Sequence, residues 1–477
     1  MGPGPRGEAW SAHTRAARRL GTMFAAVVVA FFLVRLLGGP WPHFPPTYPD
    51  SFSYLKVARR GPFHARFFFD ERPIGYPLLL WFVGRSPTLA VVAQTGIYVA
   101  AFWTLCRVVF AEMRSRVIGV VAVILIASVA IEPRNSLWNT LILSESLSTS
   151  LAILSIAAWW RAAARPSKRT VTWAWIATAA WILVRDTNVL PTVLVILPVA
   201  LACTWASRSR GGDPALRRRL WSGAVVILFV CGYVYVAQAE SHRTQYSVDN
   251  VVGMRVLPDA GLTRWFTEGG MPLDDALRGR TNRNAWDDDE AFLRAPELAR
   301  YRAWARGPGG RRLLLSMVVR SPDWWTRFHE DLPGILGDDD RAYDSYAVFA
   351  RFPHHLPAPF GTPRTSAGLW AGLLLGAAGL GLAAADRRRR LLGAVVAAGL
   401  LSAIVDVWCS YVGDPIAVDR HMVGPLARLS VLVIVAVALG ADTAIARWQR
   451  SPAPVGAVAA PSPPETVAVL HGARGDA

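Results

Sequence analysis

Residues 48–80, YPDSFSYLKVARRGPFHARFFFDERPIGYPLLL, hold the densest group of side chains that could do chemistry. The carboxylate of Asp50 and the guanidinium of Arg72 stand close to two phenols, Tyr54 and Tyr76. The stretch follows one apolar run and leads into another. A polar, aromatic, proline-rich loop beside a membrane span is a place where a membrane enzyme can meet both a lipid and water. We therefore take this stretch as the centre of a candidate site.

The composition predicts the class of protein that positions this loop. The chain has 477 residues, of which 53% are hydrophobic, and its mean hydropathy is +0.29. It contains many apolar runs of the length needed to cross a bilayer of about 30 Å. We therefore expect an all-α polytopic membrane protein.

The net charge of +17 has an ordinary explanation in such a protein. The arginine clusters stand next to apolar runs, as the positive-inside rule requires, so we expect no nucleic-acid partner. The four cysteines fall in or at the edge of apolar runs without zinc or disulfide spacing, which predicts buried, inert thiols.

Placing the basic loops on one side gives ten spans with both chain ends in the cytoplasm. No small-x-small cleavage site follows the first apolar run, so we expect an uncleaved span there. Residues 75–83 are too short to cross and predict an interfacial or re-entrant helix. The expected spans are 20–37, 88–110, 117–131, 144–160, 171–184, 189–205, 220–237, 367–385, 391–409 and 425–446.

This topology divides the chain into four parts. Residues 1–238 form an N-terminal transmembrane module whose first outer loop is 39–87. Residues 239–365 form a mainly helical extracytoplasmic domain, with short helices expected near 273–277, 291–306, 311–319 and 322–331. Residues 366–446 form a C-terminal module of three spans, with Gly372 and Gly376 spaced for close helix packing. Residues 447–477 are expected to be a disordered cytoplasmic tail.

The same topology brings charged residues from five separate loops to the outer membrane surface. Ionisable residues gathered at span ends on one face indicate a functional site. The outward N-termini of two spans would also favour anions there. The residues are Asp50, Arg72, Glu145, Arg185, Asp186, Asp414, Asp419, Arg420 and His421.

Each of these residues could instead have an ordinary structural role. Asp50 and Glu145 stand where they could cap helices. Arg185 and Asp186 could form an exposed ion pair worth under about 1 kcal/mol. The Arg-His pair at 420–421 could anchor the chain at the interface. Their combination across five loops favours the functional interpretation.

Two acidic runs, at 287–290 and 338–340, raise the question of a metal site. Adjacent aspartates usually point different ways, so solvated loops are the favoured interpretation. The sequence contains no HExxH, CxxC, P-loop, GxSxG or dinucleotide fingerprint. That absence argues against transport driven by a nucleotide site in this chain.

Three short motifs resemble the GT-C superfamily of integral-membrane glycosyltransferases. They are DSFSY at 50–54, RPIGYPLLL at 72–80 and LSESL at 143–147. The resemblance covers mainly residues 20–200 and is nearest to the branch with protein O-mannosyltransferases and aminoarabinose transferases. Many members carry a second acid beside the first-loop aspartate, whereas Ser51 follows Asp50 here. No cofactor is required, and metal dependence stays open.

The resemblance implies transfer of a sugar from a polyprenyl-phosphate donor at the outer face of the cell membrane. Nucleotide sugars are absent there, so the activated sugar must travel on a lipid in the bilayer. Asp50 would be the general base on an acceptor hydroxyl, worth roughly 10²–10⁴-fold, with inversion at the anomeric carbon. Glu145 would orient hydroxyl groups. The acceptor could be a glycan, a lipid or a protein.

The resemblance also implies a set of substrate-binding residues. Arg72, Arg185 and Arg420 would hold the leaving phosphate, because arginine is always charged and binds phosphate bidentately. Tyr54 and Tyr76 would stack on the sugar or line the lipid groove. The remaining substrate-binding candidates are Asp186, Asp414 and His421.

Two other classes of function stay open. A transporter or lipid flippase would carry charges in the middle of its spans and show paired halves with broken helices. The spans are almost free of central charges, Asp406 being the main exception, and no duplication is visible. A non-catalytic assembly factor would tolerate alanine at each outer charge.

Overall fold

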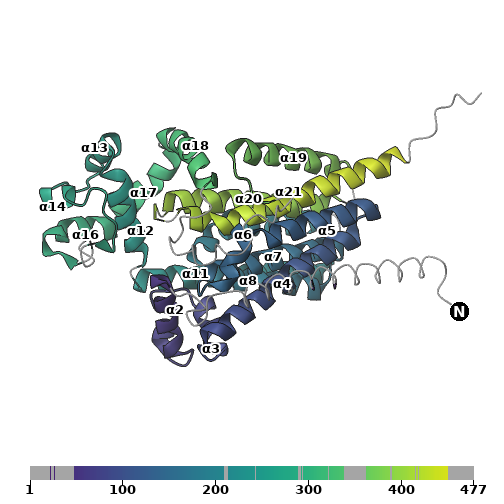
Figure 1. The fold of residues 1–477 in the computed structure, drawn as a ribbon, viewed down its shortest axis with the longest axis horizontal. Helices are drawn as coiled ribbons and strands as arrows, with labels where there is room; N and C mark the ends of the chain where they lie inside the picture. Colours follow the sequence, from purple (N-terminus) through teal and green to yellow (C-terminus); the bar gives the residue numbers. More distant parts are fainter. Residues whose placement is uncertain are drawn as a thin grey trace, which may run out of the picture.

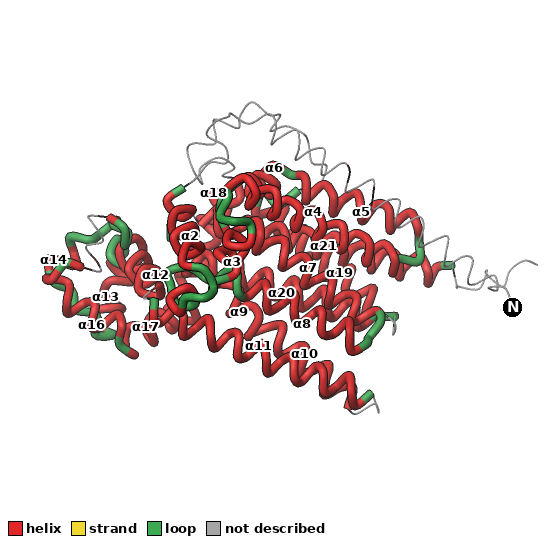
Figure 2. The backbone as a smooth tube through the Cα atoms, turned by 90° about the horizontal axis from the view of Figure 1, so that it is seen from below, coloured by secondary structure: helices red, strands yellow, loops and turns green. Residues whose placement is uncertain are grey.

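A computed structural model shows a bundle of long helices with a group of shorter helices at one end (Figures 1 and 2). It describes residues 48–208, 213–241, 243–287, 294–320, 322–337, 361–386, 389–413 and 418–449, together with residues 22, 26, 292, 415 and 416. No strand occurs among these described residues.

Among the described residues, six helices are long and apolar enough to cross a membrane, judged by length and composition. A seventh, α5 (Arg116–Ile131), would be added if it forms one bent span with residues 134–140, at an angle of 59°. The six are α4 (Pro87–Glu112), α7 (Ser144–Ala164), α11 (Pro214–Glu240), α19 (Ser366–Ala384), α20 (Arg390–Gly413) and α21 (Val418–Trp448).

The expected count of ten spans is not confirmed. The first expected span, 20–37, lies outside the described residues apart from two positions. Every other expected span lies on helix, but α8 (Lys168–Ile182) is short. The expected span 189–205 is broken into α9 (Val189–Pro191), a π-helical turn η4 (Thr192–Ile196) and α10 (Leu197–Arg208). Pro198, which lacks a backbone N–H, lies two residues after the π turn.

Local sequence signals explain where the long helices start. Ser86 caps α4 by accepting from the backbone N–H of Leu89 at 3.3 Å, and Pro87 occupies the first helical position. Asp213 and Pro214 start α11 in the same way. Thr365 caps α19 through the backbone N–H of Gly368. The capping residues and the apolar runs are independent signals, and both place the starts of these helices at the same positions.

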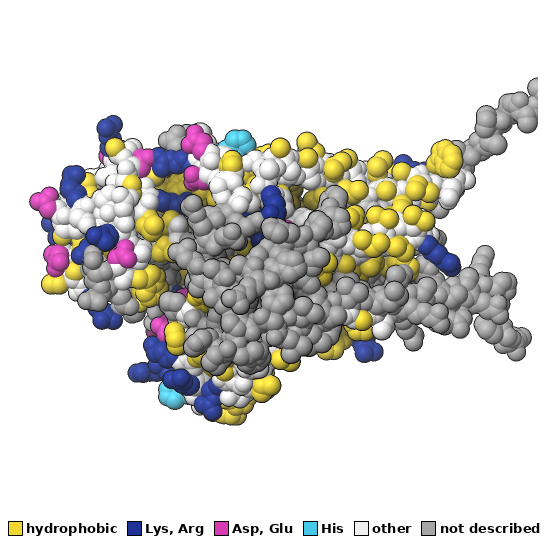
Figure 3. All heavy atoms as spheres, viewed as in Figure 1, with side chains coloured by type: hydrophobic (Ala, Val, Ile, Leu, Met, Phe, Trp, Pro, Cys, Tyr) yellow, Lys and Arg dark blue, Asp and Glu magenta, His cyan; other side chains and the backbone are white. Residues whose placement is uncertain are grey.

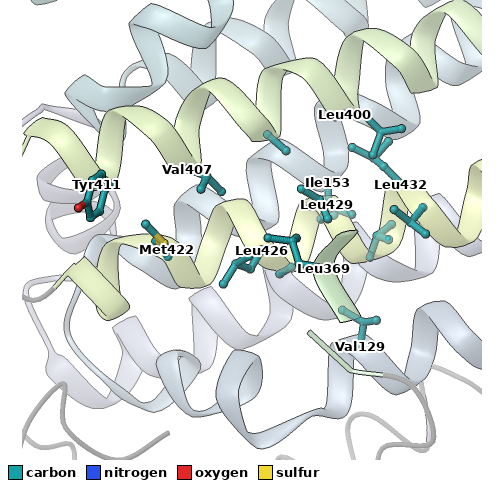
Figure 4. Close-up of a cluster of buried hydrophobic side chains, with 14 of the residues drawn as sticks. Val129, Ile153, Leu369, Leu400, Val407, Tyr411, Met422, Leu426, Leu429 and Leu432 are labelled. Atoms are coloured by element: carbon teal, nitrogen blue, oxygen red, sulfur yellow. The ribbon is translucent and has the colours of Figure 1, made fainter. Parts of the chain in front are cut away.

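The long helices pack around a core of buried aliphatic side chains from α5, α7, α19, α20 and α21 (Figure 4). The closest approach joins α19 to α21, where a Cβ on Gly379 would lie 2.4 Å from the carbonyl oxygen of Ala436. Gly440 lies directly against Gly379. The close packing expected at Gly372 and Gly376 therefore occurs one turn later. A Cβ at either of those two glycines would make only an ordinary van der Waals contact with Val433.

On the face drawn in Figure 3, hydrophobic side chains cover much of the described surface of the long helices, whereas charged side chains gather at the end that carries the shorter helices. Helix α11 alone exposes Trp221, Phe229 and several valines and leucines along its length. Exposed aliphatic and aromatic side chains along spanning-length helices are typical of a lipid-facing surface.

Residues 239–365 supply the shorter helices, which extend beyond that end of the bundle (Figures 1 and 2). Helix α18 folds back on the bundle, where Trp325 stacks on Trp408 of α20 with ring centroids 4.0 Å apart. The elements are α12 (Arg243–Val251), the π turn η5 (Val252–Val256), α13 (Ala260–Glu268), α14 (Asp275–Arg278), η6 (Pro296–Leu298), α16 (Ala299–Arg306), α17 (Pro308–Arg320) and α18 (Pro322–Gly337).

The first loop forms two helices against the bundle, α2 (Pro49–Arg60) and α3 (Gly75–Phe82), joined through the short η1 (Ala65–Phe67). Helix α3 has eight residues, as expected of a segment too short to cross. Its first residue, Gly75, donates its backbone N–H to the carbonyl oxygen of Leu183 at 2.8 Å. A Cβ at Gly75 would lie 2.8 Å from the same oxygen, so only glycine fits this contact.

Candidate active site

Asp50 lies in the first turn of α2, at the end of the bundle that carries the shorter helices. The helix is capped by Tyr48, whose backbone N–H donates to the hydroxyl of Ser51 at 3.0 Å. Asp50 therefore does not serve as the N-cap, which was its ordinary alternative. Its carboxylate instead points to two arginines from distant parts of the chain.

Arg420 is the residue that joins the loops. Its Nη2 lies 2.6 Å from Oδ2 of Asp50, and its Nε lies 2.5 Å from Oε1 of Glu145. Glu145 is in the first turn of α7 and its side chain is 1% exposed, whereas Asp50 is 26% exposed. The guanidinium of Arg420 thus joins its own helix to two segments that lie far from it in the sequence. The sequence-based expectation that Asp50, Glu145 and Arg420 converge is met in this geometry.

Arg72 holds the other oxygen of the Asp50 carboxylate. Its Nη2 lies 2.5 Å from Oδ1 of Asp50, and its Nε donates to the hydroxyl of Ser53 at 2.6 Å. The guanidinium carbon also lies 4.8 Å from the ring centre of Tyr54. A cation over an aromatic face gains electrostatic attraction, so Tyr54 helps fix Arg72.

The two tyrosines form the buried floor of the first loop. Their rings meet edge to face with centroids 5.0 Å apart. Tyr54 donates its hydroxyl to Ser144 at 2.8 Å, and Tyr76 donates to Oε1 of Gln94 at 3.1 Å. Tyr54 is 4% exposed and Tyr76 is fully buried, so Tyr76 acts as packing and not as an open contact for a ligand.

The arginines set the ionisation of Asp50. Burial by itself would raise the pKa of Asp50, but the positive charges and hydrogen bonds of Arg420 and Arg72 outweigh it and hold the pKa well below its usual range. Burial raises the pKa of Tyr54, so its phenol stays neutral. Asp50 is consequently a carboxylate at any ordinary pH.

Arg185 and Asp186 do not pair with each other, so the exposed ion pair considered for them is absent. Arg185 extends to His421, with 2.6 Å between its Nη2 and the imidazole Nδ1. Asp186 pairs with Arg243 at the start of α12, with an N–O distance of 2.8 Å. Both residues are mostly buried, and each ties the end of α8 to a different neighbour.

Some predicted residues lie outside the described part of the chain. They are Asp414, the side chain of Asp419, the whole acidic run at 338–340 and residues 288–290 of the other acidic run. Among the described residues, no three His, Cys, Asp or Glu side chains gather in a way that could hold a metal ion.

Sequence reasoning missed three residues of this end of the bundle. Ser53 and Arg243 complete the partners of Arg72 and Asp186. Arg428 of α21 pairs with Asp406 of α20 inside the bundle, and both side chains are 5% exposed. A signal for Arg428 was present, because an arginine inside the expected span 425–446 needs a buried partner. No signal marked Arg243, which stands in a polar segment rich in arginine.

The assembled groups can bind an anion beside a carboxylate. Three guanidinium groups, from Arg72, Arg185 and Arg420, face two carboxylates, from Asp50 and Glu145. Among the described side chains one positive charge is left over, because Asp186 is matched by Arg243. Arginine clusters of this kind favour planar, bidentate binding of phosphate or carboxylate groups.

No protein-family model matches this chain, and no curated protein matches it either. Among solved structures it is similar to the archaeal oligosaccharyltransferase AglB from Archaeoglobus fulgidus, solved in complex with an inhibitory peptide and a dolichol-phosphate. The TM-score is 0.44 and the sequence identity is 12%. The match covers 88% of this chain and 50% of that one, so this chain spans about half the length of AglB.

Proposed function

We propose that this protein is a membrane glycosyltransferase that moves a sugar from a polyprenyl-phosphate donor to an acceptor hydroxyl at the extracytoplasmic face. The observation that carries the proposal is the position of Asp50, which touches both Arg72 and Arg420 while keeping 26% of its side chain exposed. A base, a phosphate-binding pair and access to water thus occur together at one end of apolar helices.

Arg72 and Arg420 bind the phosphate that leaves. In the ligand-free site their guanidinium groups are occupied by Asp50, and the surplus positive charge favours an incoming anion. A donor phosphate competes with the carboxylate for the same N–H groups. Arg185, which lies 2.6 Å from His421, adds a third positive charge that acts on Glu145.

Asp50 removes the proton from the acceptor. The acceptor oxygen attacks the anomeric carbon, its proton passes to Asp50, and the bond from that carbon to the phosphate oxygen breaks with its electron pair staying on phosphate. In the free site the low pKa of Asp50 makes it a weak base. A phosphate that draws Arg72 and Arg420 away raises this pKa, so donor binding itself activates the base.

Purified protein incubated with a panel of labelled polyprenyl-phosphate sugars, with and without chelator, tests the proposal. We expect turnover with at least one donor, and a loss of about 10²–10⁴-fold in Asp50→Asn. Glu71→Gln is the matched control, because Glu71 in the same loop makes only an exposed pair with Lys56 at 3.1 Å. Full activity of Asp50→Asn would remove Asp50 from the mechanism.

A transporter or flippase is the second candidate, and one observation favours it. The ion pair between Asp406 and Arg428 is buried between two spanning-length helices, where charged residues commonly mark a substrate or ion path. Translocation of a fluorescent polyprenyl phosphate by proteoliposomes, lost on Asp406→Asn and without any sugar transfer, would favour this candidate over the first.

A further inference from the structure

One pair of aromatic rings at the exposed end of the molecule has no part in the proposed chemistry. Tyr246 of α12 and Trp286, in the loop after α14, stack with ring centroids 4.2 Å apart and an angle of 15° between their planes. Trp286 is 51% exposed. About half of this side chain is accessible, so a ligand can contact the ring while it stays stacked on Tyr246.

The loop that carries Trp286 is held in place by several hydrogen bonds. Three hydrogen bonds join Asn284 and Asp287, and the backbone N–H of Trp286 donates to Oδ1 of Asn284 at 2.8 Å. The buried Ala285 donates its backbone N–H to Asn250 of α12 at 2.8 Å. The ring is therefore presented in one position before any ligand arrives, which lowers the entropy cost of binding.

Gly253 packs closely against the backbone of the same loop. A Cβ at Gly253 would lie 2.0 Å from the carbonyl oxygen of Arg283, and the backbone N–H of Asn282 donates to the carbonyl oxygen of Gly253 at 3.0 Å. Asn282 itself has a φ of 61°, a left-handed conformation that asparagine tolerates better than most residues. The loop thus adopts a specific, tightly packed shape.

Helix α12 connects this ring pair to the candidate active site. Arg243, Tyr246 and Asn250 are spaced i, i+3 and i+7, so they share one face of the helix. Arg243 pairs with Asp186 beside the arginine cluster, Tyr246 stacks on Trp286, and Asn250 holds the loop. Arg243 and Tyr246 are only about 4.5 Å apart along the helix axis.

We propose that the Tyr246–Trp286 pair is a platform for a sugar ring of the acceptor, so that the acceptor is a glycan longer than the unit that reacts. A sugar ring has an apolar C–H face that fits a flat aromatic surface and a rim of hydroxyls. The same loop also exposes Asn282 and Arg283, whose polar side chains can hydrogen-bond to hydroxyls. This inference rests on the proposed function and names its acceptor.

A membrane anchor is the main competing role for exposed tryptophan, and position argues against it here. The stacked pair of Trp325 and Trp408 lies where α18 meets the end of the spanning helix α20, as interfacial tryptophans do. Helices α12, α14 and α16 extend beyond the end of the bundle instead (Figures 1 and 2). Trp286 is also flanked by polar and charged residues.

Binding without any donor tests the platform. Full-length protein in lipid nanodiscs is titrated with hexamers of mannose, glucose and galactose, a hexameric uronate and a single-stranded oligonucleotide. We expect at least one saccharide to bind, with affinity reduced about tenfold in Trp286→Ala and restored in Trp286→Phe. Trp325→Ala, an equally exposed and stacked tryptophan, is the control and keeps the affinity. Tyr246→Ala gives a second, independent weakening.

The outcomes separate this inference from the proposed function. Binding that depends on Trp286 in a protein without transferase activity would keep the platform and remove the enzyme. Transferase activity with Trp286→Ala unchanged in acceptor KM would keep the enzyme and remove the platform. No saccharide bound, or binding of the oligonucleotide alone, would also overturn it.

Discussion

A single guanidinium determines how the charged groups at this end of the bundle are arranged. Arg420 touches Asp50 and Glu145, two carboxylates that would otherwise repel each other in a mostly buried setting. Its side chain is 10% exposed and that of Glu145 is 1% exposed. Such a pair is a weak net source of stability, but the loss of one partner leaves an uncompensated buried charge.

We therefore expect Arg420→Gln to lower the free energy of unfolding by about 3–5 kcal/mol. Adding Glu145→Gln should recover a large part of that loss, because the buried charge is then gone. Denaturant unfolding of the two single variants and the double variant measures the coupling. Lys56→Gln, which loses only the exposed pair with Glu71, is the control and should change stability by under about 1 kcal/mol. Additive losses in the double variant would contradict the bridging role.

The ionisation of Asp50 gives the site a defined response to acid. Its pKa in the folded protein lies below that of the unfolded chain, because Arg420 and Arg72 more than offset the effect of burial. A carboxyl group of this kind stabilises the fold above its unfolded pKa of about 3.9, and that contribution is lost as the pH falls further.

The unfolding temperature should therefore fall more steeply between about pH 5 and about pH 3 in the wild type than in Asp50→Asn. The other carboxylates titrate in both proteins, so the difference between the two slopes isolates Asp50. Thermal unfolding followed by circular dichroism across this range is the measurement. Parallel slopes would mean that the arginines do not hold Asp50 in its charged form.

At the scale of elements, the arrangement depends on how the first loop is attached to the bundle. Helix α3 begins at Gly75, whose backbone N–H bonds the last turn of α8 at Leu183. Arg72 lies three residues before this contact and Arg185 two residues after it. The hydrogen bond between Gly75 and Leu183 forms at a contact that leaves no room for a side chain. It therefore ties together the two segments that carry Arg72 and Arg185.

Gly75→Ala should push α3 away from α8, since the added methyl would lie 2.8 Å from both the carbonyl oxygen of Leu183 and Cγ2 of Val184. We expect a loss of stability of about 1–3 kcal/mol and a drop in transfer, as Arg72 moves with the loop. Gly96→Ala on α4 is the matched control, because a Cβ there meets nothing within 4 Å. Equal behaviour of the two variants would show that the contact at Gly75 is unimportant.

The sequence predicts the helices better than any other feature of the structure. Apolar runs bounded by Ser86, Thr365 or an arginine cluster predict most helix ends to within a few residues, because burial and capping depend on local sequence. The break in the span at 189–205 was not expected, since its pattern is apolar throughout and only the prolines hint at the π turn.

The sequence predicts that Asp50 and Arg420 lie on the same face, because every span reverses the direction of the chain and alternate loops share one face. It does not predict which side chains form ion pairs. Asp186 pairs with Arg243 and not with the adjacent Arg185, and Arg428 pairs with Asp406. These pairs depend on how the helices pack, and that packing has no signature in the sequence. Side-chain pairing depends on helix rotation, which an apolar run does not specify.

At the scale of the whole molecule, the two ends of the bundle carry different chemistry. One end holds the candidate active site and the shorter helices (Figure 1). The other is joined by the buried pair of Arg389 and Asp442 and by Arg114 bonded to Asp386 at 2.6 Å. Arginine-rich loops that end spanning helices are retained on the cytoplasmic side, so the site should face outward.

Single cysteines at the two ends test this orientation. In a background with the four native cysteines replaced, Phe63→Cys in the first loop should react with a membrane-impermeant maleimide on intact cells, because Phe63 is 92% exposed. Lys168→Cys, exposed at the start of α8 at the other end, should react only after the membrane is permeabilised. The cysteine-free protein gives the background signal.

The result bears on the chemistry as well as on the topology. If the site faces outward, the proposed donor has to be carried on a lipid, because nucleotide sugars are absent there. The arginine cluster would then bind the phosphate of that lipid. If the maleimide labelled the Lys168→Cys variant in intact cells and did not label the Phe63→Cys variant, Asp50 would lie on the cytoplasmic side. The physical reason for a polyprenyl-phosphate donor would then be lost, although the contacts of Arg420 would stand.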